Sequence, residues 1–180
     1  MNHPADSTAP SRPDAGVPVA AVPASCMPEA ASEPVSPGCP LCQAQHETVL
    51  WQDARLRIIH VTSEAGLPAY FRVIWRAHVP EMTDLAGADR QYLWQVLTVV
   101  EQGMRLHFQP AKINLAAFGN QVPHLHWHLI GRWPSDPQFP GSAWSPVVRP
   151  DGSSEQLAVA ARVAERLPAF RQWLAQQLAE

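Results

Sequence analysis

Residues 122–130 read Val-Pro-His-Leu-His-Trp-His-Leu-Ile, so three histidines stand at alternate positions, each followed by an apolar residue. Successive side chains of a β-strand point to opposite faces, so this alternation predicts a half-buried strand. His124, His126 and His128 would then line one face, while the apolar residues anchor the other face in a core. A single strand histidine is usually only solvated, but these are three of the chain's eight within five residues. Because imidazole acts as nucleophile, proton donor or metal ligand near neutral pH, the row of histidines predicts a catalytic or metal-binding site.

Length and charge narrow the function classes. The 180 residues fit one domain of ordinary size with a buried core. The net charge of −3 gives no basic footprint, so neither a nucleic-acid polymer nor an anionic membrane is an expected partner. No apolar run approaches the roughly 20 residues that span a bilayer. With three cysteines and no signal-like N-terminus, we expect a cytoplasmic protein without a disulfide framework.

The chain divides into three predicted parts. Nine of the 19 prolines lie in the first forty residues, which show no helix or strand periodicity, so residues 1–36 are predicted to be a disordered Pro/Ala-rich leader. Its Cys26 has no assigned role. Residues 37–147 form the predicted folded domain. Residues 148–180 form a predicted C-terminal helical extension, in which Pro168 is expected to separate two helices.

The patterning of the domain predicts an α+β fold, with an antiparallel meander of strands around one long helix. The expected strands are 48–52, 56–61, 70–75, 112–118 and 124–133. The long helix is expected at 88–108, with a buried stripe at helical spacing formed by Leu93, Val96, Leu97, Val100 and Met104. We interpret four tryptophans as core fillers: Trp51, Trp75, Trp94 and Trp127.

Cys39-Pro-Leu-Cys42 is a second motif that could carry out redox chemistry or bind a metal ion. A redox role needs such a pair to open a helix after a strand in a βαβ unit, and no such context is predicted. Two thiolates with two imidazoles would complete a closed tetrahedral zinc site. Two buried thiols without a metal are the alternative, because cysteine is often an apolar core residue.

With these motifs in place, the chain resembles the histidine-triad (HIT) family of nucleotide hydrolases and transferases. The family signature is His-φ-His-φ-His-φ-φ, with φ apolar, and residues 124–130 match it at every position. The resemblance spans roughly residues 39–146 and implies a HIT-like antiparallel meander sheet. One departure stands in the third strand, where relatives carry Gly-His-x-Leu-Val-x-Pro: here Tyr70 replaces the histidine and Trp75 the proline.

The resemblance implies catalysis on the α-phosphate of a nucleotide. His126 would attack phosphorus to give a covalent nucleotidyl-histidine, and His128 would hold the developing charge. Asn114 matches the family's phosphate- and ribose-contacting asparagine. The turn carrying Gly119 and Gln121 would offer N–H groups to the phosphate.

The resemblance also implies a ligand set and partners. In relatives with the cysteine pair, the other ligands correspond to His78 and His124, which would give a structural zinc; no organic cofactor is expected. Without metal, His124 would be free to assist protonation of the leaving group. Relatives are homodimers. The expected substrate is a purine nucleotide, as a nucleoside monophosphate conjugate or a dinucleoside polyphosphate, for a hydrolase of phosphoramidase or dinucleoside polyphosphate hydrolase type.

Two other functions fit the same residues. The first is a zinc-stabilised nucleotide-binding module with little or no turnover. The second is a metallohydrolase with three histidine ligands and an activated water. Such a site usually recruits a carboxylate, and no Asp or Glu stands near the triad before Asp136.

Overall fold

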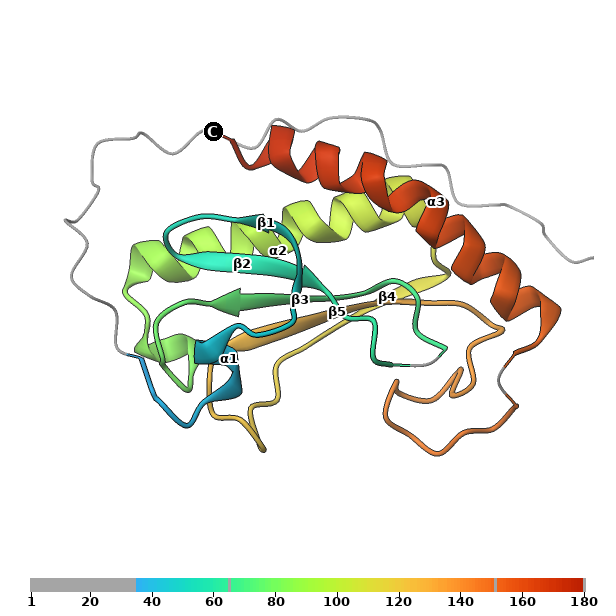
Figure 1. The fold of residues 1–180 in the computed structure, drawn as a ribbon, viewed down its shortest axis with the longest axis horizontal. Helices are drawn as coiled ribbons and strands as arrows, with labels where there is room; N and C mark the ends of the chain where they lie inside the picture. The colour runs from blue at the N-terminus through green and yellow to red at the C-terminus, as the bar shows by residue number, and fades with distance from the viewer. Residues whose placement is uncertain (1–34, 65, 151, 180) are drawn as a thin grey trace, which may run out of the picture.

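The structure is a computed structural model that describes residues 35–64, 66–150 and 152–179. Most of the predicted leader, including Cys26, lies outside the described residues. The elements, shown in Figure 1, are α1 (Pro40–Gln43), β1 (Thr48–Gln52), β2 (Leu56–His60), β3 (Tyr70–Trp75), a 3₁₀ turn η1 (Met82–Asp84), α2 (Gly87–Phe108), β4 (Lys112–Ala116), β5 (His126–Arg132) and α3 (Ser154–Gln177).

The five strands form one antiparallel sheet in the order β1-β2-β3-β5-β4, which confirms the predicted α+β meander. Strand β5, which carries two of the histidines, lies between β3 and β4. Its register sets His128 opposite Arg72 of β3 and Ala116 of β4. The predicted histidine strand is shorter than expected, because pairing with β3 begins at His126 and leaves His124 outside the strand.

The main core lies between the sheet and the two long helices, which Figure 1 shows on one side of the sheet. The odd-numbered residues of β3 and β5 face this core, and Phe71, Val73 and Leu129 among them are fully buried. The predicted apolar stripe of α2 is confirmed, since each of its five residues is at most 1% exposed.

The prediction that Pro168 separates two helices is wrong, because α3 continues from Ser154 to Gln177 with Pro168 inside it. A proline removes one backbone N–H donor from the helix ladder and disturbs the preceding turn, but it need not end the helix. Val163 lies before Pro168, and Phe170 and Leu174 lie after it. All three are buried in the main core, so the parts of α3 before and after Pro168 pack against the same core.

The prediction of four core tryptophans is wrong for Trp94, which is 48% exposed. Trp94 is one position past the buried Leu93, and a single helical step turns a side chain by about 100°. Its ring instead packs on that of Trp127, with 5.2 Å between centroids. Trp75 is buried as predicted, whereas Trp51 and Trp127 are only partly buried against the core.

The other face of the sheet carries the polar residues. The even-numbered residues of β3 and β5, among them Arg72, His126 and His128, share it. A smaller apolar cluster covers part of this face and includes Cys39, Tyr70, Ile130 and Ala143 of the 134–150 loop. In the part of the chain that the structure describes, no helix is long and apolar enough to cross a membrane.

Candidate active site and metal centre

His126 and His128 form an adjacent pair at the start of β5. Residues two apart on a strand share a face, and their ring centroids are 4.7 Å apart. His128 is 5% exposed, while His126 is partly exposed at the strand's beginning. The pair therefore presents one accessible imidazole beside one enclosed imidazole.

A backbone contact fixes the protonation of His126. Its Nδ1 lies 2.6 Å from the carbonyl oxygen of His124. A carbonyl only accepts hydrogen bonds, so Nδ1 carries the proton and Nε2 carries the lone pair. Burial lowers the pKa of His126 below its usual value, which keeps the ring neutral near pH 7. This is the form of imidazole that can attack an electrophile.

His128 is held by Tyr70, whose hydroxyl lies 2.5 Å from His128 Nδ1. Arg72 donates from Nε to the same hydroxyl oxygen at 3.0 Å. Burial, with smaller contributions from the charges of His126 and Arg72, lowers the pKa of His128 to about 3. The ring is therefore neutral at physiological pH, with one ring nitrogen protonated and the other free to accept a hydrogen bond.

Two exposed aromatic rings border His128. The centroid of Trp144 lies 5.3 Å and that of Phe118 5.6 Å from the imidazole, and both side chains are about half exposed. They contact each other edge to face at 5.0 Å. Trp133, in contrast, is 6% exposed and belongs to the main core. Of these two tryptophans near the end of β5, only Trp144 belongs to the site.

His124 takes part in a different cluster. The ligand atoms of Cys39, Cys42, His78 and His124 all lie within 4.8 Å of one another. Three of the four sulfur–nitrogen separations are 3.4–3.5 Å: Cys39 to His124, Cys42 to His78 and Cys42 to His124. The two Nδ1 atoms are 3.3 Å apart. Tetrahedral zinc with bonds of about 2.3 Å to sulfur and about 2.0 Å to nitrogen requires separations of about 3.5 Å and about 3.3 Å. The four residues therefore fit a Cys₂His₂ zinc site.

The second nitrogen of His124 supports this arrangement. Nε2 donates to the carbonyl oxygen of Trp75 at 2.6 Å, so Nδ1 is the unprotonated nitrogen and faces the thiols. Metal-ligating histidines characteristically donate their other N–H to a carbonyl or carboxylate in this way. Cys39 is the N-cap residue of α1, and Cys42 lies within that short helix.

The predicted phosphate-binding residues lie at different places around the pair. Asn114 shares the polar face, and its Oδ1 accepts from Arg132 Nη1 at 2.8 Å, which leaves the amide N–H groups as donors. Gly119 has a φ of +72°, which favours glycine in the turn between β4 and β5. Gln121 is exposed in the same turn.

Sequence reasoning missed Arg72 and Arg132. Arg132 is 2% exposed, pairs with Asp136 at 2.7 Å and donates to the carbonyl of Gly141 at 3.1 Å. It thereby holds the 134–150 loop beside Asn114. Continuing the alternation of the histidine row would have placed Arg132 on the polar face, because it is an even number of residues from His128.

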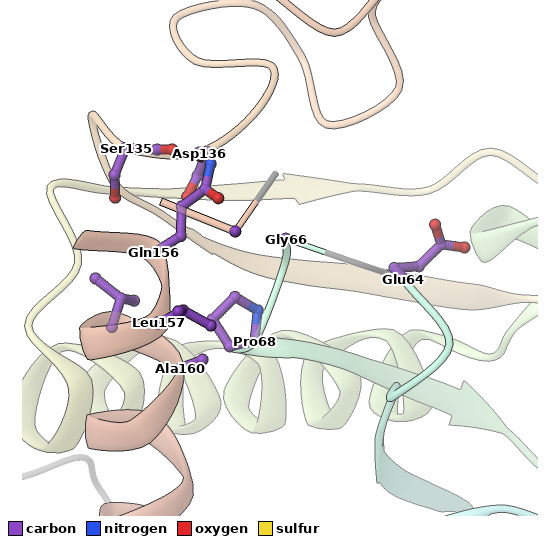
Figure 2. Close-up of a pocket in the computed structure, with 10 residues that line it drawn as sticks. Glu64, Gly66, Pro68, Ser135, Asp136, Gln156, Leu157 and Ala160 are labelled. Atoms are coloured by element: carbon purple, nitrogen blue, oxygen red, sulfur yellow. Dashed lines mark hydrogen bonds between the residues drawn. The ribbon is translucent and has the colours of Figure 1, made fainter. Parts of the chain in front are cut away.

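A separate hollow of about 220 Å³ lies at the start of α3 (Figure 2). It is formed by the loop between β2 and β3, the loop after β5 and the first turns of α3, and its lining includes Glu64, Pro68, Asp136, Gln156 and Leu157. None of the predicted site residues lines it.

Comparison with known proteins, by sequence and by structure, shows which family the chain resembles. The HIT domain profile matches residues 43–135, more than half of the chain. The chain belongs to the HIT family. This places it among nucleotide-binding proteins and hydrolases, as the resemblance implied. No match among curated proteins is found.

Solved HIT structures share the fold. A histidine triad protein from Marinobacter aquaeolei is 26% identical, with a TM-score of 0.52, and the match covers 69% of this chain and 90% of that one. A HIT protein from Sinorhizobium meliloti is 24% identical, with a TM-score of 0.52 and coverage of 67% and 89%. A third, from Bradyrhizobium japonicum, is 19% identical, with a TM-score of 0.53 and coverage of 67% and 90%.

Proposed function

We propose that this HIT protein is a nucleotide hydrolase or nucleotidyl transferase that acts on the α-phosphate through His126. The observation that carries the proposal is the contact of His126 Nδ1 with the His124 carbonyl, because it leaves the Nε2 lone pair free for attack. The substrate is a purine nucleotide, either as a nucleoside monophosphate conjugate or as a dinucleoside polyphosphate.

The proposed reaction has two displacements. Nε2 of His126 attacks phosphorus, a P–N bond forms, and the leaving group departs with the electron pair of its bond to phosphorus. Water or another acceptor then attacks phosphorus, and the P–N bond breaks to regenerate the imidazole. His128 donates to a non-bridging phosphate oxygen, and the free amide hydrogens of Asn114 add a second donor. Phe118 and Trp144 offer an apolar border to the group bound beside His128.

Trapping of the covalent intermediate tests the nucleophile. Adenylyl and guanylyl conjugates are mixed with the protein, and the quenched sample is analysed by intact mass. Wild type should gain one nucleotidyl group, whereas His126→Ala should gain none and lose more than about 10³-fold in turnover. Replacing the exposed His46 by Gln is the matched control and should leave both readouts unchanged.

Two results would change the assignment. Undiminished turnover in His126→Ala would remove the covalent mechanism. Nucleotide binding without an adduct or turnover in wild type would favour the zinc-stabilised binding module, the second function that the sequence allows.

We further propose that Cys39, Cys42, His78 and His124 hold a structural zinc ion. The fit of their ligand separations to tetrahedral zinc supports this. When bound, the ion cross-links the α1 turn to the segments after β3 and before β5. His124 then serves as a ligand, which leaves His126 and His128 to act on the substrate.

Elemental analysis of protein purified without added zinc tests the metal site. We expect about one zinc per chain in wild type and in Cys26→Ser, and less than a tenth of that in Cys42→Ser. Chelation should lower the unfolding temperature of wild type and leave that of Cys42→Ser unchanged. Zinc below a tenth of an equivalent in wild type would defeat the assignment.

The homodimer implied by the resemblance also stands as a proposal. Among the described residues, strand β4 is an edge strand with β5 on one side only, so its outer backbone groups can pair with a second copy. Trp94 is 48% exposed on α2, beside Trp127. An exposed tryptophan of this kind is a frequent anchor of protein interfaces.

A further inference from the structure

The histidine that relatives carry in the third strand is replaced here by Tyr70, and the structure shows what the tyrosine contacts. Its side chain is fully buried on the polar face of β3. Its hydroxyl lies 2.5 Å from His128 Nδ1 and 3.0 Å from Arg72 Nε. The three side chains therefore form one chain of hydrogen bonds that ends on the imidazole next to the proposed nucleophile.

We propose that Tyr70 and Arg72 are positioning residues that hold His128 in the tautomer with its proton on Nε2, so that this N–H faces the substrate phosphate. The inference rests on the proposed function, because His128 has the role of phosphate donor only if His126 attacks phosphorus.

The direction of the hydrogen bonds follows from counting protons. Arg72 Nε only donates, so the Tyr70 oxygen accepts from it. If His128 Nδ1 also donated to that oxygen, the Tyr70 hydroxyl proton would be buried without an acceptor, which is unfavourable. The consistent order is Arg72 to Tyr70 and Tyr70 to His128 Nδ1, and the only ring proton of neutral His128 is then on Nε2.

Charge and burial strengthen this order. The Arg72 guanidinium polarises the phenol, which makes the hydroxyl a better donor. Burial raises the pKa of Tyr70, and burial likewise lowers that of His128, so both groups are neutral and the hydroxyl keeps its proton. A neutral Nε2–H offers a fixed dipole to the phosphate without placing a second cation beside Arg72.

Nitrogen NMR of histidine-labelled protein without substrate tests the tautomer directly. Long-range proton–nitrogen spectra distinguish protonated from unprotonated ring nitrogens, and His128→Gln identifies the His128 signals. Wild type should show His128 protonated on Nε2. In Tyr70→Phe, which removes only the hydroxyl, the signals should move toward a mixture of both tautomers. The rate constant of turnover should fall about tenfold, with KM changed by less than about twofold.

The matched control is Tyr92→Phe, which removes the hydroxyl of the chain's other tyrosine. That hydroxyl donates to Asp53 Oδ2 at 2.7 Å, a contact outside the proposed machinery. Neither the His128 tautomer nor the turnover number should change in this variant. Arg72→Met is the second test variant, and it should also weaken the preference for Nε2, because the hydroxyl is then free to rotate.

The outcomes separate this proposal from the one on which it rests. A His128 protonated on Nδ1 in wild type would overturn it, whatever the activity. So would an unchanged tautomer in both Tyr70→Phe and Arg72→Met. Full turnover of His126→Ala would instead refute the nucleophile and leave the measured tautomer in place. If Tyr70→Phe fails to fold, the tautomer of His128 in wild type and in Arg72→Met still tests the proposal.

Discussion

His124 and His126 are two positions apart, yet they bind the backbone through opposite ring nitrogens. His124 donates from Nε2 to the Trp75 carbonyl, and His126 donates from Nδ1 to the His124 carbonyl. Each contact leaves the other nitrogen unprotonated. His124 therefore turns a lone pair toward the cysteines, and His126 keeps one for a substrate. One alternating motif thus serves both a candidate metal site and a candidate nucleophile.

The lowered pKa of His128 predicts a pH-dependent stability. Its pKa falls from 6.5 to about 3 on folding. Above pH 6.5 the ring is neutral in both states and the stability is fully present. Between pH 6.5 and 3 the unfolded chain binds a proton that the folded state excludes, so stability falls as pH falls. The slope from this group is at most about 1.4 kcal/mol per pH unit.

Urea unfolding of wild type and His128→Gln, followed by tryptophan fluorescence at pH 7, 6 and 5, measures this contribution. The variant should lose less stability on acidification than wild type, by about 1–2 kcal/mol between pH 7 and 5. The comparison concerns slopes, so a constant offset from the lost Tyr70 contact does not affect it. Equal slopes for the two proteins would show that His128 takes up its proton without unfolding.

The chemical residues were predictable to different degrees. Alternation alone predicted that His126 and His128 share a face, and the structure bears this out. Arg72 was not predictable as a partner of His128, because the register of β3 against β5 is set by packing over a separation of more than fifty residues. The Tyr70 contact depends on the same register.

Among the elements, the crossing of α2 and α3 depends on Gly103. A methyl group there would lie 2.5 Å from Trp173 Cζ3 and 2.6 Å from Phe170 Cε2. Alanine gains about 1 kcal/mol in helix propensity over glycine. Overpacking a buried contact costs about 1–3 kcal/mol, and Phe170 is fully buried, so the steric cost should prevail. Gly103→Ala should therefore lower the free energy of unfolding.

Gly87→Ala is the matched control, because a methyl group at the first residue of α2 meets only the end of the Arg90 side chain at 4.0 Å. Denaturant unfolding should show Gly87→Ala unchanged or slightly more stable. Gly103→Ala should be less stable by up to about 2 kcal/mol, the steric cost less the gain in helix propensity. A Gly103→Ala protein as stable as the control would mean that the two helices separate without cost.

The sequence patterns predicted which helices and strands are present better than they predicted the residues at which these elements begin and end. The periodicity of α2 and the extents of β1 and β3 were predictable, since each has a strong local pattern. Pro168 misled the prediction for α3, because a local helix breaker was outweighed by contacts with a distant part of the chain. The same contacts join α3 to the main core.

Over the whole molecule, the two faces of the sheet have different roles: one forms the main core and the other carries the candidate active site. One face packs against α2 and α3, and the other carries the imidazole pair, Arg72 and Asn114. The buried Arg132 and Asp136 pair fastens the 134–150 loop over the second face. That loop brings Trp144 to His128, so changes in this loop can alter the border of the site without altering the main core.

The proposed dimer would contact two exposed features of the molecule. They are the outer edge of strand β4 and the Trp94 side chain on α2. The outer backbone groups of β4 have no strand beside them in the part of the chain that the structure describes. Trp127 Nε1 is buried and has no hydrogen-bond partner among the described residues. Trp94 covers Trp127 and presents its own ring outward. A second copy packed on Trp94 would bury this ring.

Light scattering coupled to size-exclusion chromatography measures the result. Wild type should have twice the 19.8 kDa mass of the chain. Trp94→Arg should shift the population toward monomer, with a dissociation constant raised more than about tenfold, because removal of an aromatic anchor costs at least about 2 kcal/mol. Leu157→Arg is the control, since Leu157 is a 62% exposed apolar residue on α3, and it should remain dimeric. A monomeric wild type would refute the dimer. A dimeric Trp94→Arg would place the interface elsewhere, with the β4 edge as the remaining candidate.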